Sequence, residues 1–208
     1  MTTARHALAL LLAGPLFGPA LACSANAEVP AGASAAPSAG ADEVPVVQRE
    51  AYFAGGCFWG VEHYMEQLDG VLAVDSGYMG GHVESPSYDD VSSQTSGHLE
   101  TVRVRYDPAR IDYEAIAKRF FEIHDPTQQD GQGVDIGPEY LSAVFYGNAD
   151  EQRTTLALIE RLKARGYDVV TQVRPAERFW VAEGYHQDWY ARTGKSPVCH
   201  SRVRRFGD

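Results

Sequence analysis

The sequence predicts an α+β protein, a two-layer α/β sandwich whose sheet is mixed or antiparallel. Strand patterns alternate with helical patterns between residues 51 and 189. The strands are few and short, and the loops between them are long. The short strands and the long loops argue against a large doubly wound fold, whose parallel sheet is covered by helices on both faces.

In the first half, a strand over 51–54 stops at Gly55-Gly56, and helical spacing then predicts a helix that ends at Gly70. A second strand covers 71–78, and a long loop runs to Gly97. The next strand, 99–106, alternates in polarity, which is typical of a half-buried strand. One of its faces carries Glu100, Val102, Val104 and Tyr106.

In the second half, Asp112 is a candidate N-cap for a helix that carries Ile116, Phe120 and Ile123. A strand is predicted over 140–146. Asn148 with Glu151 resembles a capping box for a helix that runs to residue 163 and is closed by Gly166. The last strand is predicted over 169–173, and residues 179–189 are predicted to be partly helical.

Composition places the chain among globular proteins. Of 208 residues, 44% are hydrophobic and 22% are charged. The formal net charge of −10 repels nucleic acid, so no nucleic-acid partner is expected. Three cysteines are too few for a disulfide scaffold.

Residues 1–22 are interpreted as an export signal. Arg5 precedes an apolar run that ends in small residues around Ala22, and the run is too short to span a bilayer. Cleavage after Ala22 would leave Cys23 first, as in a lipoprotein, whereas cleavage after Ala27 would remove Cys23. Both alternatives stay open.

Residues 23–47 are rich in Ala, Pro, Gly and Ser and are interpreted as a flexible tether. The folded domain is therefore expected over 48–208. We expect an exported protein of the periplasm or cell envelope, with or without a lipid anchor and membrane tether at Cys23.

The segment Gly55-Gly56-Cys57-Phe58-Trp59-Gly60 contains the strongest chemical signal. The glycines allow a sharp turn from strand to helix, which puts Cys57 at a helix N-terminus. Free backbone N–H groups there stabilise an anion, so the pKa of Cys57 is expected to fall and its thiolate to be favoured. The alternative is a small buried hydrophobic cysteine.

This segment resembles the signature of the A-type peptide methionine sulfoxide reductases, and the resemblance extends over about residues 51–200. The other matching segments are GYMGG at 77–81, PSY at 86–88, SGHLE at 96–100, HDP at 124–126, residues 131–140 and AEGYHQ at 182–187. The resemblance implies a ferredoxin-like fold and reduction of the S-epimer of methionine sulfoxide in oxidised proteins and peptides. It implies no bound cofactor or metal, and an external thioredoxin-like protein or dithiol as the reductant.

The resemblance also implies roles for single residues. Cys57 attacks the sulfoxide sulfur and Glu100 donates a proton to the oxygen. Burial of the strand face that carries Glu100 would raise the pKa of its carboxyl group. The alternative is a surface carboxylate paired with Arg103 or Arg105.

For substrate binding, the resemblance implies that the hydroxyls of Tyr88 and Tyr140 hold the oxygen, and that Phe58 and Trp59 form a pocket for the S-methyl group. Asp135 matches an acidic residue that orders water, and its alternative role is to cap a loop.

Cys199 matches the recycling cysteine, which converts the sulfenic acid at Cys57 into a disulfide. The usual ending is of the type Asn-Pro-x-Gly-Tyr-Cys, whereas residues 193–200 read TGKSPVCH, with one extra residue. We expect Cys199 to be the resolving residue on a mobile tail; the alternative is an inert cysteine.

Other functions remain as alternatives. A Cys-based thiol peroxidase would also place a thiolate at a helix start, and a non-catalytic exported domain would hold a Cys57–Cys199 disulfide. Zinc binding lacks suitable cysteine spacing. A thiol hydrolase needs a histidine base. The candidates are His63, His82, His98, His124 and His186.

Overall fold

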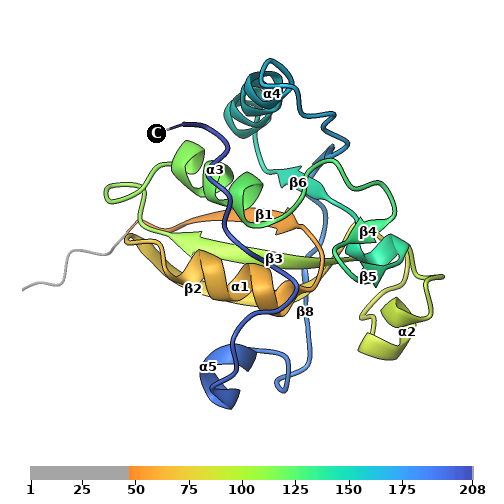
Figure 1. Cartoon of the computed structure of the whole chain (residues 1–208). Coiled ribbons are helices and arrows are strands. Elements are labelled where there is room, and N and C mark those ends of the chain that lie inside the picture. Colours follow the sequence, from red (N-terminus) through yellow and green to blue (C-terminus); the bar gives the residue numbers. More distant parts are fainter. Residues whose placement is uncertain (1–46, 208) are drawn as a thin grey trace, which may run out of the picture. The chain divides into compact units, whose positions relative to one another are not determined.

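The structure, a computed structural model, describes residues 47–207 (Figure 1). A six-stranded sheet has the order β7-β6-β1-β3-β2-β8; β6 and β7 are parallel, and the other neighbours are antiparallel. Its strands are β1 (Arg49–Ala54), β2 (Val71–Met79), β3 (Leu99–Tyr106), β6 (Ala143–Tyr146), β7 (Gln172–Pro175) and β8 (Trp180–Val181). A separate hairpin pairs β4 (Gly131–Gln132) with β5 (Asp135–Ile136).

The main helices are α1 (Phe58–Glu66), α3 (Tyr113–Ile123) and α4 (Ala149–Lys163). Figure 1 shows α1 and α3 lying along one face of the sheet, and α4 packs against α3 and β6. The elements β1-α1-β2 and β3-α3-β6 form two split βαβ units with the strand order β6-β1-β3-β2, which is the ferredoxin-like arrangement. The predicted α+β fold with a mixed sheet is confirmed.

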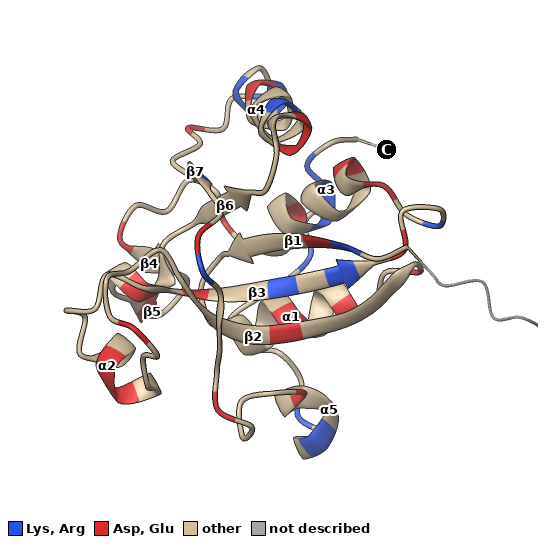
Figure 2. Cartoon of the chain, turned by 180° about the vertical axis from the view of Figure 1, so that it is seen from behind, with Lys and Arg blue, Asp and Glu red and all other residues tan. Residues whose placement is uncertain are grey.

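The face of the sheet away from α1 and α3 has a smaller apolar cluster that includes Met79, Leu99 and Phe145. In Figure 2 the chain between β7 and β8 crosses this face. Arg103 and Arg105 also lie here, and both pair with Asp75. Glu100 lies on the opposite face of β3, so it does not pair with either arginine.

Several local predictions are confirmed. The strand over 99–106 has the predicted bounds, and its predicted inner face is buried. Asp112 caps α3 by accepting a hydrogen bond from the N–H of Ala115 at 2.7 Å. Asn148 accepts hydrogen bonds from the backbone at the start of α4, and Gly166, with φ +91°, follows its end.

Other local predictions are wrong because long-range pairing decides the structure. Residues 179–189 are less helical than predicted: only Trp189, which begins α5 (Trp189–Thr193), is helical, and Trp180 instead pairs with Tyr78 as part of β8 at the edge of the sheet. The strand predicted over 169–173 begins only at Gln172, because the N–H of Val170 donates to Pro126 O instead. The strand predicted over 140–146 begins at Ala143, since residue 140 ends a 3-10 turn (Pro138–Tyr140).

The predicted loop between residues 79 and 97 contains a short helix, α2 (Tyr88–Ser92). Its signal was present in the sequence as Ser87 and Asp90, which form a capping box with reciprocal hydrogen bonds. The β4–β5 hairpin was not predicted either.

Over residues 47–207, every helix is too short or too polar to cross a bilayer. The predicted export signal, and the predicted tether except Val47, lie outside the described residues.

Candidate active site

The predicted site residues meet in one pocket of about 260 Å³ at the start of α1. It is lined by Cys57, Phe58, Trp59, Tyr88, Glu100, Asp135, Tyr140, Trp189, Tyr190, Val198 and Cys199. All eight residues that the sequence singled out are therefore neighbours, although they come from distant parts of the chain.

Cys57 is the N-cap residue of α1, as predicted. Gly56 makes the turn before it with φ +91°, and a Cβ there would lie 2.5 Å from the side chain of Gln132. The predicted fall in pKa is wrong: burial, and then the nearby charge of Glu100, raise the pKa of Cys57 well above its ordinary value. A hydrogen bond from the backbone of Trp59 only partly opposes this shift. At neutral pH Cys57 is a thiol.

The first backbone amide of α1 is bound by Glu100 and not by the sulfur of Cys57. Because Phe53 pairs with Val102, Glu100 lies beside the turn that follows β1. Its side chain is 3% exposed, and the N–H of Phe58 donates to Oε2 at 2.9 Å. Burial raises the pKa of Glu100 to about 8, although this hydrogen bond acts in the opposite direction. Glu100 is therefore mostly a neutral acid at pH 7.

Tyr88 and Tyr140 line the same pocket. Burial, followed by the charge of Glu100, raises the pKa of both hydroxyls above the ordinary value. Both groups therefore stay protonated and can donate a hydrogen bond to a ligand oxygen.

The apolar wall contains two residues that the sequence analysis missed, Trp189 and Tyr190 from α5. The rings of Trp59 and Trp189 stack with centroids 4.3 Å apart and planes 3° apart. Tyr190 packs edge-on against Trp189. In the sequence, only their aromatic character suggested a place in the pocket wall, because α5 is brought against α1 by tertiary folding.

Cys199 lines the same pocket as Cys57, and both are free thiols. Burial, and then a hydrogen bond with Asp135, raise the pKa of Cys199 to about 11. The structure thus places Asp135 against the second thiol. Whether Asp135 also orders water stays a prediction.

The expectation of a mobile tail is wrong for the residues that follow Cys199. His200 is buried, and its Nε2 donates to Gly55 O at 2.8 Å. Its ring occupies the space beside Gly60, where a Cβ would lie 2.2 Å from Nδ1. Further on, the N–H of Val203 donates to Glu122 O at 2.7 Å, and Phe206 joins the core. Cys199 is therefore held close to an anchored segment.

Within residues 47–207, no group of three or more His, Cys, Asp or Glu side chains is arranged to hold a metal ion. The chemistry that the described residues offer is that of two thiols, a neutral carboxylic acid and two phenols in a pocket with an aromatic wall.

Comparison with known proteins agrees with this site. Residues 49–207 match the family model described as peptide methionine sulfoxide reductase. Peptide methionine sulfoxide reductase MsrA 2 from Caulobacter vibrioides is 49% identical over 150 residues, which cover 70% of this chain and 74% of the relative. Reduced Mxr1 from Saccharomyces cerevisiae superposes with a TM-score of 0.70 at 29% identity, covering 75% of this chain and 91% of Mxr1.

The same yeast protein, solved in complex with Trx2, has the same fold with a TM-score of 0.52 at 22% identity, over 76% of this chain and 92% of Mxr1. With a family match over most of its length and a close curated relative, the chain belongs to the peptide methionine sulfoxide reductase family.

Proposed function

We propose that this pocket reduces the S-epimer of methionine sulfoxide, with Cys57 as nucleophile, Glu100 as proton donor and Cys199 as resolving thiol. Membership of the family supports the reaction, and the observation that carries the assignment is the buried Glu100 carboxyl beside Cys57, with a pKa of about 8. A thiol peroxidase or a purely structural disulfide gives no reason for the aromatic wall or the two phenols. Neither alternative is favoured.

In the first step, the Tyr88 and Tyr140 hydroxyls bind the sulfoxide oxygen, and the methyl group lies against Phe58 and Trp59. Glu100 protonates the oxygen, and Cys57 Sγ attacks the sulfoxide sulfur. The thiol proton of Cys57 passes to the Glu100 carboxylate. The oxygen then passes as a hydroxyl group to Cys57 Sγ: the S–O bond of the substrate and the new bond between Cys57 Sγ and the substrate sulfur both break. Methionine sulfur gains the two electrons, and Cys57 ends as a sulfenic acid that carries the oxygen.

In the second step, Cys199 Sγ attacks the sulfenic sulfur. A Cys57–Cys199 disulfide forms and the oxygen leaves as water. Both cysteines line the same pocket, so the attack takes place within it. An external dithiol then reduces the disulfide and is itself oxidised.

The pH dependence should follow Glu100. Its pKa is about 8, so the donor proton is present at pH 7 and is lost as the pH rises. We expect kcat/KM for methionine sulfoxide, which reports the free enzyme, to be level near pH 7 and to fall above pH 8. Alkylation of Cys57 should rise over the same range, because its thiolate becomes more abundant. A kcat/KM that keeps rising through pH 9 would contradict the assignment.

The proposed reaction can be followed by intact mass. After one equivalent of methionine sulfoxide, without reductant, the wild-type protein should lose two hydrogen atoms, and Cys199→Ser should instead gain one oxygen atom at Cys57. Cys199→Ser should also stop after one turnover with a thioredoxin. If hydrogen peroxide alone causes these changes, the protein is a peroxidase; if neither oxidant does, the structural disulfide is the better interpretation.

We propose a thioredoxin-fold protein as the reductant, which the complex of yeast Mxr1 with Trx2 supports by analogy. We also propose export to the periplasm or cell envelope, based on the pattern of residues 1–22. An oxidising compartment would need such a donor to be supplied with electrons from inside the cell. Intact mass of the mature protein would show the cleavage site and any acyl chains on Cys23.

A further inference from the structure

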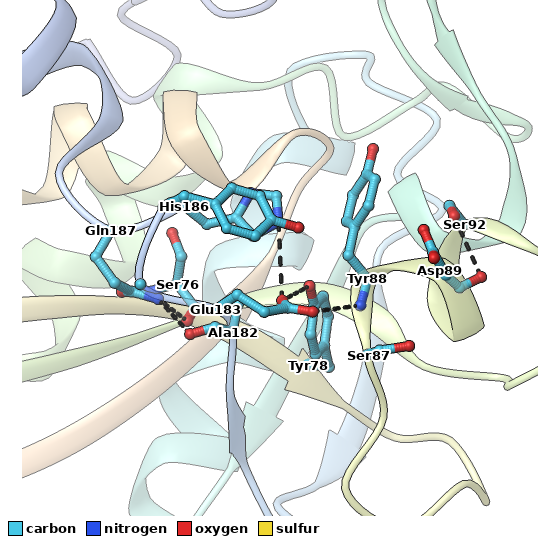
Figure 3. A network of polar contacts seen from close by, with 12 residues as sticks. Ser76, Tyr78, Ser87, Tyr88, Asp89, Ser92, Ala182, Glu183, His186 and Gln187 are labelled. Atoms are coloured by element: carbon cyan, nitrogen blue, oxygen red, sulfur yellow. Dashed lines mark hydrogen bonds and ion pairs between the residues drawn. The ribbon is translucent and has the colours of Figure 1, made fainter.

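The turn between β8 and α5 (residues 182–187) is fixed to the edge of the sheet next to the pocket. Gln187 holds it there: its Oε1 accepts from the N–H of Ser76 at 2.9 Å, and its Nε2 donates to Ser76 O at 2.9 Å and Ala182 O at 3.0 Å (Figure 3). Of the described residues that line the pocket, none comes from this turn. Two side chains of the turn nevertheless form hydrogen bonds with residues that line the pocket.

Glu183 binds the backbone of Tyr88. Its Oε1 accepts from the Tyr88 N–H at 2.8 Å, and its Oε2 accepts from the Tyr78 hydroxyl at 3.0 Å (Figure 3). Burial acts against ionisation, but these hydrogen bonds outweigh it and lower the pKa of Glu183. Tyr88 is the first residue of α2, and such an N–H has no partner within its own helix. An ionised Glu183 therefore fixes the start of the helix that carries the Tyr88 phenol.

His186 binds the side chain of Trp59. The indole N–H of Trp59 donates to His186 Nδ1 at 3.1 Å. The imidazole is 2% exposed, and its centroid lies 4.9 Å from that of Phe58 and 4.9 Å from that of Tyr88. His186 thus packs between the apolar wall and the oxygen-binding phenol.

The geometry also fixes the tautomer of His186. Burial lowers its pKa, so the ring is neutral at pH 7. Because an indole N–H can only donate, Nδ1 must accept and the ring proton is on Nε2. Nε2 lies 3.8 Å from Glu183 Oε2 and has no hydrogen-bond partner among residues 47–207. The ring proton therefore faces the carboxylate.

We propose that Glu183 and His186 form a positioning pair for the reduction: Glu183 fixes Tyr88, and His186 fixes Trp59. The inference rests on the roles proposed above for those two residues. Tyr88 and Trp59 come from different elements and bind opposite ends of the sulfoxide group. The pair joins them through one turn, so it sets the spacing between the oxygen-binding and methyl-binding sides of the pocket.

A double-mutant cycle tests the Glu183 contact. Glu183→Gln keeps the size of the side chain but removes its negative charge, so the hydrogen bond from the Tyr88 N–H is no longer charge-assisted, while the new NH2 group can donate to the Tyr78 hydroxyl. We expect kcat/KM for methionine sulfoxide to fall about 10- to 100-fold. In a Tyr88→Phe background the same substitution should cost less than about threefold, because the phenol it positions is absent. Glu177→Gln, an exposed carboxylate nearby in the sequence, is the matched control and should change nothing.

The His186 contact is tested by a pair of substitutions. His186→Phe removes the acceptor for Trp59 and should raise KM about tenfold, with a smaller effect on kcat. His186→Asn keeps an acceptor near the position of Nδ1 and should restore much of the loss. If His186 had only a structural role, the KM values of His186→Phe and His186→Asn would not differ in this way.

Several results would overturn the inference. If Glu183→Gln lowers kcat/KM equally in the wild-type and Tyr88→Phe backgrounds, Glu183 does not act through Tyr88. The same conclusion follows if Glu183→Gln lowers kcat/KM while Tyr88→Phe alone leaves it unchanged. If Glu183→Gln does not fold, Glu183→Asp takes its place in the cycle, because the shorter side chain withdraws from the Tyr88 N–H. None of these outcomes bears on Cys57 or Glu100, whose own variants test the proposed function separately.

Discussion

Replacing Cys57 with serine is expected to abolish methionine sulfoxide reduction, with a fall of at least about 10⁴-fold. A serine hydroxyl is far less acidic than a thiol and cannot pass through a sulfenic acid. The measurement is methionine formed in a single turnover without reductant. This format reports the first step alone, so recycling cannot mask the result.

Cys199→Ser is the matched control, since it removes one sulfur from the same pocket. It should still form about one equivalent of methionine. If Cys57→Ser instead converts substrate and Cys199→Ser does not, the two cysteines have been assigned in the wrong order. If both variants convert substrate, neither thiol is the nucleophile.

Glu100→Gln has the next largest expected effect, a fall of about 10²- to 10⁴-fold in the single-turnover rate. The amide oxygen can still accept the hydrogen bond from the N–H of Phe58, so the start of α1 should keep its structure. What disappears is a proton that can be transferred to the sulfoxide oxygen. The fall in kcat/KM above pH 8 should disappear with it.

Two controls separate chemistry from structure. Glu62→Gln changes another buried carboxyl whose pKa burial raises to about 8, but Glu62 does not line the pocket, so the rate should stay within about threefold. In Glu100→Gln itself, alkylation of Cys57 above pH 8 should become faster, because a negative charge beside the thiol is gone. An unchanged reduction rate in Glu100→Gln would move the proton-donor role to another group.

The parts of the fold that were predictable are those decided by local sequence. Asp112 caps α3 by accepting a hydrogen bond from the N–H of Ala115, only three residues away. The alternation of polar and apolar residues along β3 likewise indicates that one of its faces is buried. The segment around Trp180 was not predictable in this way. It becomes a strand because the edge of β2 is available for pairing, which no pattern within residues 179–189 shows.

For the site, the family resemblance predicted residues that meet in one pocket, but the predicted electrostatics of Cys57 is wrong. A helix N-terminus stabilises a thiolate only if the sulfur has good access to its amides and to solvent. Here Glu100 from β3 accepts the hydrogen bond of the first amide, and burial disfavours a charge on sulfur. Both effects depend on strand register, so only the folded structure shows them.

The histidine that follows the second cysteine fixes the C-terminal segment to the start of α1. His200 ties the chain to the carbonyl of Gly55, two residues before Cys57, and fits against α1 only because residue 60 has no side chain. An insertion upstream of this tie lengthens the span between α5 and Cys199 but leaves the tie itself in place. A change in the length of that span would therefore leave the residue next to Cys199 attached to the segment that carries Cys57.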